Sequence, residues 1–503
     1  MNVDVQGVLS SNIRLLQRIT SSKGFGAWQK FDRASFIVDW FALYFAPNPK
    51  GSSSATAVQC EPGQITLFVA LDSPPTTDDH VAGEHLISKL REVLSLDGST
   101  KRRIMTLHRL IAEKAAPRIH RRLQMFLDVD RYQGTGAATL GLSGAFDQAV
   151  SYWESQGKEE RSSRCVGASK EIFGDEDHGV AIIKAIFGEL VKYVQEAVEI
   201  MNTGYSFDRW FPTIKNIWEC LAIVFASDAL RSVDSVFDDC LGKNLRFMRV
   251  LNIRTLHLFS YWNGAVKLVH HAIPIFRQTL GEDGVERFVR GEGDIHICWV
   301  NDLPSALPSP GESIRYSTTP AAHLNMLIEA CALRSRHRPA LREKLLQDER
   351  IAGAWGPDDE VIPRVHPELQ LILHLSREGI NVFGDQIGVS KRMCWACKEY
   401  LGIIHPKAKG IRRPKWKFSM VSGRIKHNWI PPPTPDGERV VGALMMRLLK
   451  NVSIELDLDL WDVDDVCISQ SEFCGAPSQR CSELEELDNA GLSGWAPRTQ
   501  HAT

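Results

Sequence analysis

Apolar residues recur at helical spacing through most of the first 290 residues. The clearest examples have charged residues between the apolar ones: VAGEHLISKLREVLSL, KRRIMTLHRLIAEKAAPRIHRRLQMFL and GVAIIKAIFGELVKYVQEAVEIM. Stretches rich in Pro, Gly, Ser and Thr interrupt this part of the chain after Pro47, Asp72 and Gln133. QITLFVAL, from Gln64, is a strand candidate. We therefore predict a mainly α-helical N-terminal region over residues 1–290.

The pattern changes near Gly291, where strand-like and helix-like segments begin to alternate. GDIHICWV predicts a buried strand, and SIRYST could pair with it; VIPRV, directly before His366, is the alternative second strand. Helices are predicted over LNMLIEACALRSRH, ALREKLLQDERIAGAW, LQLILHL and CWACKEYLGII, and short strands over FGDQIGVS and KWKFSMVS. A further helix, ERVVGALMMRLLKNV, follows Pro431. This alternation predicts an α/β domain over residues 291–450.

Composition sets bounds on this picture. The chain has 503 residues, of which 44% are hydrophobic and 24% charged, and this length predicts two or three domains instead of one core. A net charge of -2 produces no overall electrostatic field that would favour binding to nucleic acid or to a membrane surface. From Glu455 onward many acids are opposed only by Arg480 and Arg498, so we predict an acidic, disordered tail over residues 451–503.

The sequence also bears on the compartment. Its N-terminus has an early Asp and lacks the basic segment followed by an apolar core that is typical of a secretory signal. The apolar stretch from Cys220 is interrupted by charged residues before it reaches the length needed to span a membrane. We expect an intracellular protein, cytoplasmic or nuclear, with no membrane contact. The eleven cysteines are odd in number and thinly spread, which predicts reduced thiols. Cys467, Cys474 and Cys481 lie near one another in the tail but have no periodic context.

Two predicted helix starts carry candidate chemistry. Proline is favoured at the first helical position, so Pro367 places His366 at the N-cap and Glu368 in the first turn. Cys394 and Cys397 lie at the second helix start, where the helix dipole favours thiolates. One imidazole and two thiolates are ligands that zinc prefers, and they leave a fourth position for water. Glu368 would then be placed to transfer protons between water and substrate.

Other interpretations of the cysteine pair remain open. It could belong to a structural zinc site with His405 or His427 as fourth ligand, or be two core thiols. A redox pair is typical of a thioredoxin-like context and gives no reason for His366-Pro367-Glu368. His374, among leucines, is better explained as a buried core histidine.

Together, His366-Pro367-Glu368 and Cys394-Trp395-Ala396-Cys397 resemble the signature of zinc-dependent nucleobase (cytidine-deaminase-like) deaminases. Within that superfamily the chain resembles the fungal branch related to bacterial toxin (OTT-like) deaminases. The resemblance is carried by VHPELQLILHL, IGVSKRMCWACKEYL and VSGRIKHNWIPP. Two positions depart from the usual pattern: Pro367 replaces Ala, and Met393 replaces the Pro before the first cysteine. Neither departure removes a ligand.

The resemblance implies a fold, a reaction and roles for these residues. The fold would be a three-layer cytidine-deaminase-like α/β domain with a mixed sheet. The reaction would be hydrolytic deamination of an amino-bearing base, with zinc held by His366, Cys394 and Cys397 and with Glu368 as the catalytic acid and base. The alternative is a catalytically inactive, zinc-stabilised nucleic-acid-binding or interaction protein, since a fold does not establish activity.

The segment from Lys391 to Lys426 contains eleven Lys or Arg residues and a single acid, Glu399. Basic residues interleaved with aromatic ones suit a phosphate backbone and stacked bases, although a solvated face balanced by the acidic tail explains the charge equally well. We therefore predict a nucleotide or single-stranded nucleic acid as partner. Ser390-Lys391 also match the fungal branch, and Trp429 lies in the third resembling stretch. The candidate substrate contacts are Ser390, Lys391, Lys415, Trp416, Lys417 and Trp429.

Overall fold

The structure is a computed structural model of the chain. It describes residues 9–11, 13–15, 35–46, 53–96, 99–128, 137–155, 177–226, 245–300, 313–316, 318–330, 343, 347, 349–356, 359–391, 393–404, 416–418, 428–432 and 442–444. The predicted tail, Lys415, the three tail cysteines, both candidate fourth ligands and most of the helix predicted after Pro431 lie outside these residues. Across the described ranges, no helix combines the length and apolar character needed to cross a membrane.

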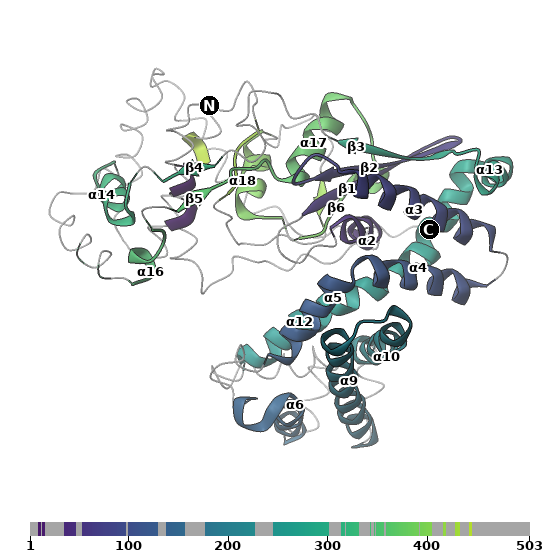
Figure 1. The fold of residues 1–503 in the computed structure, drawn as a ribbon, viewed down its shortest axis with the longest axis horizontal. Helices are drawn as coiled ribbons and strands as arrows, with labels where there is room; N and C mark the ends of the chain where they lie inside the picture. Colours follow the sequence, from purple (N-terminus) through teal and green to yellow (C-terminus); the bar gives the residue numbers. More distant parts are fainter. Residues whose placement is uncertain are drawn as a thin grey trace, which may run out of the picture.

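A five-stranded mixed sheet forms the centre of the α/β part (Figure 1). Its strands, in spatial order, are β3 (Ile295–Val300), β2 (Gln64–Leu71), β1 (Ser54–Glu61), β6 (Gln386–Val389) and β7 (Lys417–Phe418). β1 pairs antiparallel with both β2 and β6, whereas the β2–β3 and β6–β7 pairs are parallel. Strands from both sides of residue 290 therefore share one sheet, and the division into separate domains there stays a prediction.

Helices account for most of the other described elements. They are α2 (Ser35–Phe45), α3 (Thr77–Ser95), α4 (Thr100–Lys114), α5 (Ala116–Leu127), α6 (Ala137–Ser155), α9 (Asp177–Thr203), α10 (Phe207–Ala226), α12 (Leu245–Lys267), the π-turn η2 (Leu268–Ala272), α13 (Ile273–Arg290), α14 (Pro320–Ala330), α16 (Glu349–Ala352), α17 (Pro367–Arg377), the 3₁₀ turn η3 (Phe383–Asp385) and α18 (Trp395–Ile404). The helices predicted from the periodic segments before residue 290 are confirmed as α3, α4, α5 and α9.

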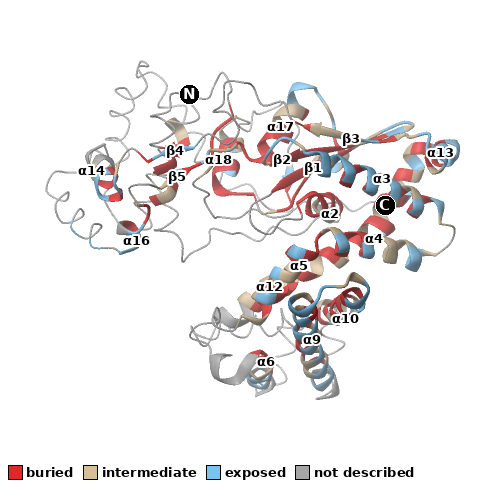
Figure 2. Cartoon of the chain, in the orientation of Figure 1, coloured by how far each residue is buried: buried red, intermediate tan, exposed pale blue. Residues whose placement is uncertain are grey.

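The two faces of the sheet are covered by different helices. Successive strand side chains point to opposite faces. Accordingly Ile65, Leu67 and Val69 pack with α2, α3 and α13, whereas Phe68 and Ala70 pack with α17 and α18. α2, β6, most of β1 and β2 and much of α17 are buried, whereas β3 is mostly half-buried (Figure 2). The result is three layers, with helices on both faces of a mixed sheet.

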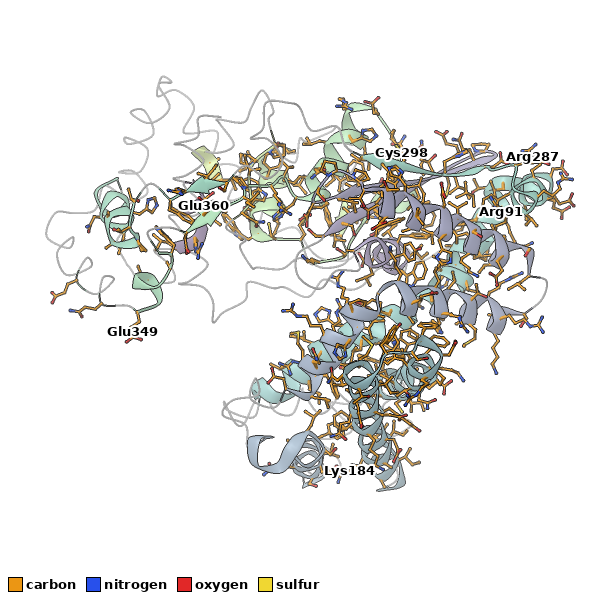
Figure 3. The ribbon with its side chains drawn as sticks, in the orientation of Figure 1. Arg91, Lys184, Arg287, Cys298, Glu349 and Glu360 are labelled. Carbon is orange, nitrogen blue, oxygen red and sulfur yellow. The ribbon has the colours of Figure 1, made fainter. Side chains whose placement is uncertain are left out.

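Arginine side chains bind backbone carbonyl groups near the carboxyl ends of neighbouring helices in the helical region. The last carbonyls of a helix have no partner within the helix. Arg91 of α3 donates to the Phe288 carbonyl near the end of α13 (2.8 Å), and Arg277 of α13 donates to the Leu94 carbonyl near the end of α3. Figure 3 shows Arg91 beside α13. These reciprocal hydrogen bonds join the two helices that cover β2 and β3.

The predicted pairing of SIRYST with GDIHICWV is wrong. β4 (Ile314–Arg315) pairs instead with β5 (Glu360–Val361), in a separate two-stranded sheet. The partner of β3 is β2, with six residue pairs in register, and this long match outcompetes a two-residue strand. An ion pair from Arg315 to Glu360 (2.9 Å) supports the small sheet, which lies far from the α3–α13 contact (Figure 3).

Gly388 permits α2 to lie directly on the sheet. A Cβ at this position would stand 2.2 Å from the Val38 carbonyl carbon and 2.6 Å from the Asp39 nitrogen, both backbone atoms that cannot rotate away. We expect Gly388→Ala to lower the free energy of unfolding by about 2–3 kcal/mol through overpacking, measured by urea denaturation. Gly188→Ala, where a Cβ in α9 meets nothing within 4 Å, is the control and should be neutral or stabilising. Equal stability of the two variants would contradict this close packing.

Candidate metal and catalytic site

The start of α17 places an imidazole and a carboxylate side by side. His366 is the N-cap, with extended backbone angles (φ -69°, ψ 145°), and Pro367 opens the helix, as predicted. The His366 carbonyl accepts hydrogen bonds from the backbone N–H groups of Leu369 (2.9 Å) and Gln370 (3.1 Å), which begins the helix. The His366 side chain makes no capping bond and is therefore available to the site. Glu368 lies in the first turn, as predicted.

The start of α18 presents the two thiols. Cys394 directly precedes the helix, and its Sγ accepts a hydrogen bond from the backbone N–H of Cys397 (3.4 Å). The Cys394 carbonyl accepts from the N–H of Lys398 (3.2 Å), so Cys394 occupies the capping position. Two helix amino ends, those of α17 and α18, thus meet at one point, and their dipoles favour negative charge there.

The four side chains converge closely. The Nδ1 of His366 lies 3.4 Å from the Sγ of Cys394 and 3.3 Å from that of Cys397, and the two sulfurs are 3.4 Å apart. An oxygen of Glu368 lies 3.6 Å from the same Nδ1. One potential ligand atom from each residue lies within 4.8 Å of the others.

This donor set fits a zinc ion. Zinc bonds of about 2.3 Å to sulfur and 2.0–2.1 Å to nitrogen place tetrahedral ligand atoms roughly 3.5–3.8 Å apart. The observed separations of 3.3–3.4 Å are slightly shorter, so a small expansion would accommodate the ion. Two sulfurs and one imidazole nitrogen are also the ligand types that zinc prefers.

Burial and mutual charge control protonation of the site. All four side chains are buried. Burial disfavours the imidazolium, but the Cys394 thiolate and the Glu368 carboxylate outweigh it and raise the pKa of His366 to about 10. Burial also acts to raise the pKa of both thiols. At Cys394 the hydrogen bond from Cys397 and the charge of His366 outweigh burial, so the pKa of Cys394 falls well below its ordinary value. At Cys397 burial is reinforced by the neighbouring Cys394, so the pKa of Cys397 rises well above its ordinary value. A bound dication would displace protons from His366 and Cys397, because ligands bind metal in their deprotonated forms.

Residues far away in sequence hold the segment before Cys394. The N–H of Val389 donates to the Asp39 carboxylate (2.8 Å). The N–H of Ser390 donates to the Ser54 carbonyl (3.0 Å), and the N–H of Ser54 donates to the Ser390 hydroxyl oxygen (2.9 Å). Arg118 donates to the Ser390 carbonyl (2.6 Å). Sequence reasoning missed Asp39, Ser54 and Arg118, because no local motif marks them.

The candidate substrate contacts occupy varied environments. Ser390 is buried in the contacts just described, Lys391 is half-buried and Lys417 is exposed on β7. Trp416 is half-buried against the hydrophobic cluster that contains α17 and α18. Trp429 is fully buried, and its ring packs edge-on against Tyr400 with centroids 6.1 Å apart. The structure thus gives Ser390 and Trp429 packing roles, and their contact with a substrate stays a prediction.

Comparison with known families bears on this site. A family model described as OTT_1508-like deaminase matches residues 365–433, a stretch that includes His366, Glu368, Cys394 and Cys397. Neither a curated protein nor a solved structure matches the chain. Residues 365–433 are therefore similar to this deaminase family and carry a buried side-chain group that could hold a metal ion.

Proposed function

We propose that the protein is a zinc-dependent hydrolytic deaminase acting on an amino-bearing nucleobase in a nucleotide or nucleic acid. One observation carries the proposal: His366, Glu368, Cys394 and Cys397 converge to within 4.8 Å inside the segment that matches a deaminase family. The proposal includes a cytidine-deaminase-like arrangement of the three layers and membership of the fungal branch.

The residues of the chain have distinct roles in this proposal. His366, Cys394 and Cys397 would hold zinc, which when bound supplies a Lewis acid that makes water nucleophilic near neutral pH. Glu368 accepts a proton from the attacking water and donates it to the ring nitrogen; it then accepts the proton of the newly formed hydroxyl group and donates it to the departing amine. The overall reaction consumes one water and releases one ammonia, and the base gains a carbonyl group where the amine was. The buried position of Glu368 keeps its proton transfers away from bulk solvent.

Ammonia release tests the proposal directly. Purified protein, loaded with one equivalent of zinc, is incubated with nucleosides, nucleotides, single-stranded DNA and RNA, and ammonia is quantified. Release from at least one class, abolished by a zinc chelator and restored by zinc, is the expected result. If zinc-loaded protein releases no ammonia from any class, the proposal fails, and the zinc-stabilised binding protein becomes the better interpretation.

The side chains of Lys417 on β7 and of Trp416 directly before it test whether the substrate is a polymer. Lys417→Glu should weaken binding of single-stranded nucleic acid and flatten its salt dependence, because fewer counterions are released from the phosphates. Trp416→Ala should cost about 1–3 kcal/mol of binding free energy if a base stacks on the ring. Fluorescence anisotropy across a salt series measures both, with Lys101→Glu, an exposed charge reversal on α4, as the control. Binding by the Lys417 and Trp416 variants that equals wild type at every salt concentration would contradict a polymeric substrate.

A further inference from the structure

Arg118 links the helical region to the chain segment that carries the thiols. It lies in the first turn of α5 and is only 6% exposed. One guanidinium nitrogen donates to the Ala46 carbonyl, just past the end of α2 (2.6 Å), and the other donates to the Ser390 carbonyl (2.6 Å). A guanidinium is a rigid, planar fork, so these two bonds fix the position of Ser390 relative to α2. Cys394 follows four residues later.

The electrostatics of Arg118 set it apart from an ordinary stabilising residue. Within the described ranges no carboxylate forms an ion pair with it, and its two hydrogen bonds go to neutral carbonyls. Burial lowers the pKa of Arg118 to about 10, so it stays protonated at neutral pH and carries a buried positive charge. A buried charge without an opposite partner is costly, and an apolar side chain of similar size often gives equal or better stability.

We propose that Arg118 is a positioning residue for the metal ligands: it holds the Ser390 carbonyl and thereby fixes the loop that presents Cys394 and Cys397 to His366. This inference rests on the metal site of the proposed function. It assigns part of the site's geometry to a helix that lies outside the segment matched by the deaminase family. The bonds of Val389 and Ser390 to Asp39 and Ser54 anchor the same strand end. Arg118 adds the bond that ties this anchor to α5.

Cobalt substitution tests the inference without relying on catalysis. Full-length protein is stripped of metal and titrated with Co²⁺, whose visible absorption reports tetrahedral geometry and thiolate ligation. Arg118→Met keeps the unbranched stem of the side chain but removes the guanidinium group and with it both hydrogen bonds. We expect its affinity for Co²⁺ to fall about tenfold, the size of effect seen when groups supporting metal ligands are removed, and its absorption spectrum to change.

Arg122 provides a matched control, one turn further along α5. It also donates to a backbone carbonyl, that of His257 (2.7 Å), and its guanidinium lies 4.8 Å from the Tyr261 ring centroid. Arg122→Met should leave the Co²⁺ affinity and spectrum as in wild type, whatever its effect on the melting temperature. Arg118→Lys keeps the charge and can reach one of the two carbonyls, so it should fall between wild type and Arg118→Met.

A shift confined to the Arg118 variants supports the inference. Wild-type Co²⁺ affinity and spectrum in Arg118→Met, or equal changes in Arg118→Met and Arg122→Met, would overturn it. If Arg118→Met does not fold, the same comparison is made between Arg118→Lys and Arg122→Lys, with the same criteria. Ammonia release by wild type is measured separately, so loss of the proposed catalytic function and loss of this positioning role give different results.

Discussion

Glu368→Gln is expected to abolish ammonia release while zinc content and melting temperature remain those of wild type. The amide has nearly the shape of the carboxylate, so it can occupy the same buried place 3.6 Å from the His366 imidazole. It cannot accept and return a proton, and loss of a general acid–base group typically costs about 10²–10⁴-fold in rate. Steady-state ammonia assays, zinc quantification by mass spectrometry and thermal unfolding provide the three measurements.

A substitution at the far end of the same helix controls for nonspecific effects. Glu378→Gln changes an exposed carboxylate paired with Arg377 at the end of α17, and it should leave activity unchanged. The decisive comparison is the metal content of Glu368→Gln. If this variant loses zinc, Glu368 is a fourth ligand. All four coordination positions would then be filled by protein side chains, with none left for water, and the site would be structural instead of catalytic.

Removing either thiol should have the largest effect on the metal and on the surrounding structure. Wild type should carry about one zinc per chain, and Cys394→Ser or Cys397→Ser should lose it, because each leaves two of the three ligands. Without the ion, α17 and α18 lose the link between their amino ends. Cleavage between residues 361 and 433 under limited proteolysis should then accelerate at least about tenfold, since the free energy of metal binding contributes to the stability of the folded state.

The control for this experiment is a cysteine away from the site. Cys220→Ser alters a half-buried thiol in α10 and should retain the zinc and the wild-type cleavage rate. Zinc retained at full occupancy by both Cys394→Ser and Cys397→Ser would exclude these thiols as ligands. The sulfur atoms would then be core packing, the plainest of the interpretations that the sequence left open.

The candidate site was predictable because its signals are local. The N-cap position of His366 follows from the proline beside it, and the spacing of Cys394 and Cys397 is a property of four consecutive residues. Their approach to within 3.4 Å could be anticipated only because the resemblance joins the two motifs. The features of the site that depend on neighbouring residues in the sequence could thus be predicted, whereas the features that depend on contacts between distant residues required the structure.

The sheet illustrates the second kind of information. QITLFVAL was recognisable as a strand, but nothing in its pattern indicates that β1, beside it, pairs with β6 across most of the chain. Arg118 is a similar case: a charged residue in an amphipathic helix predicts a solvated face, whereas here it is buried. A short strand such as β4 has too few residues to determine its partner from sequence alone.

The pairing of β1 with β6 has a consequence for synthesis of the protein. Ser54 and Ser390, which exchange hydrogen bonds at the end of this pair, are 336 residues apart. At about 5–20 residues per second, a ribosome needs roughly 17–67 s to travel that distance. During this interval the β1–β2 hairpin presents an unpaired edge, which is a template for association with other chains. Nascent chains should therefore depend on chaperones until β6 emerges, and slower translation should increase aggregation.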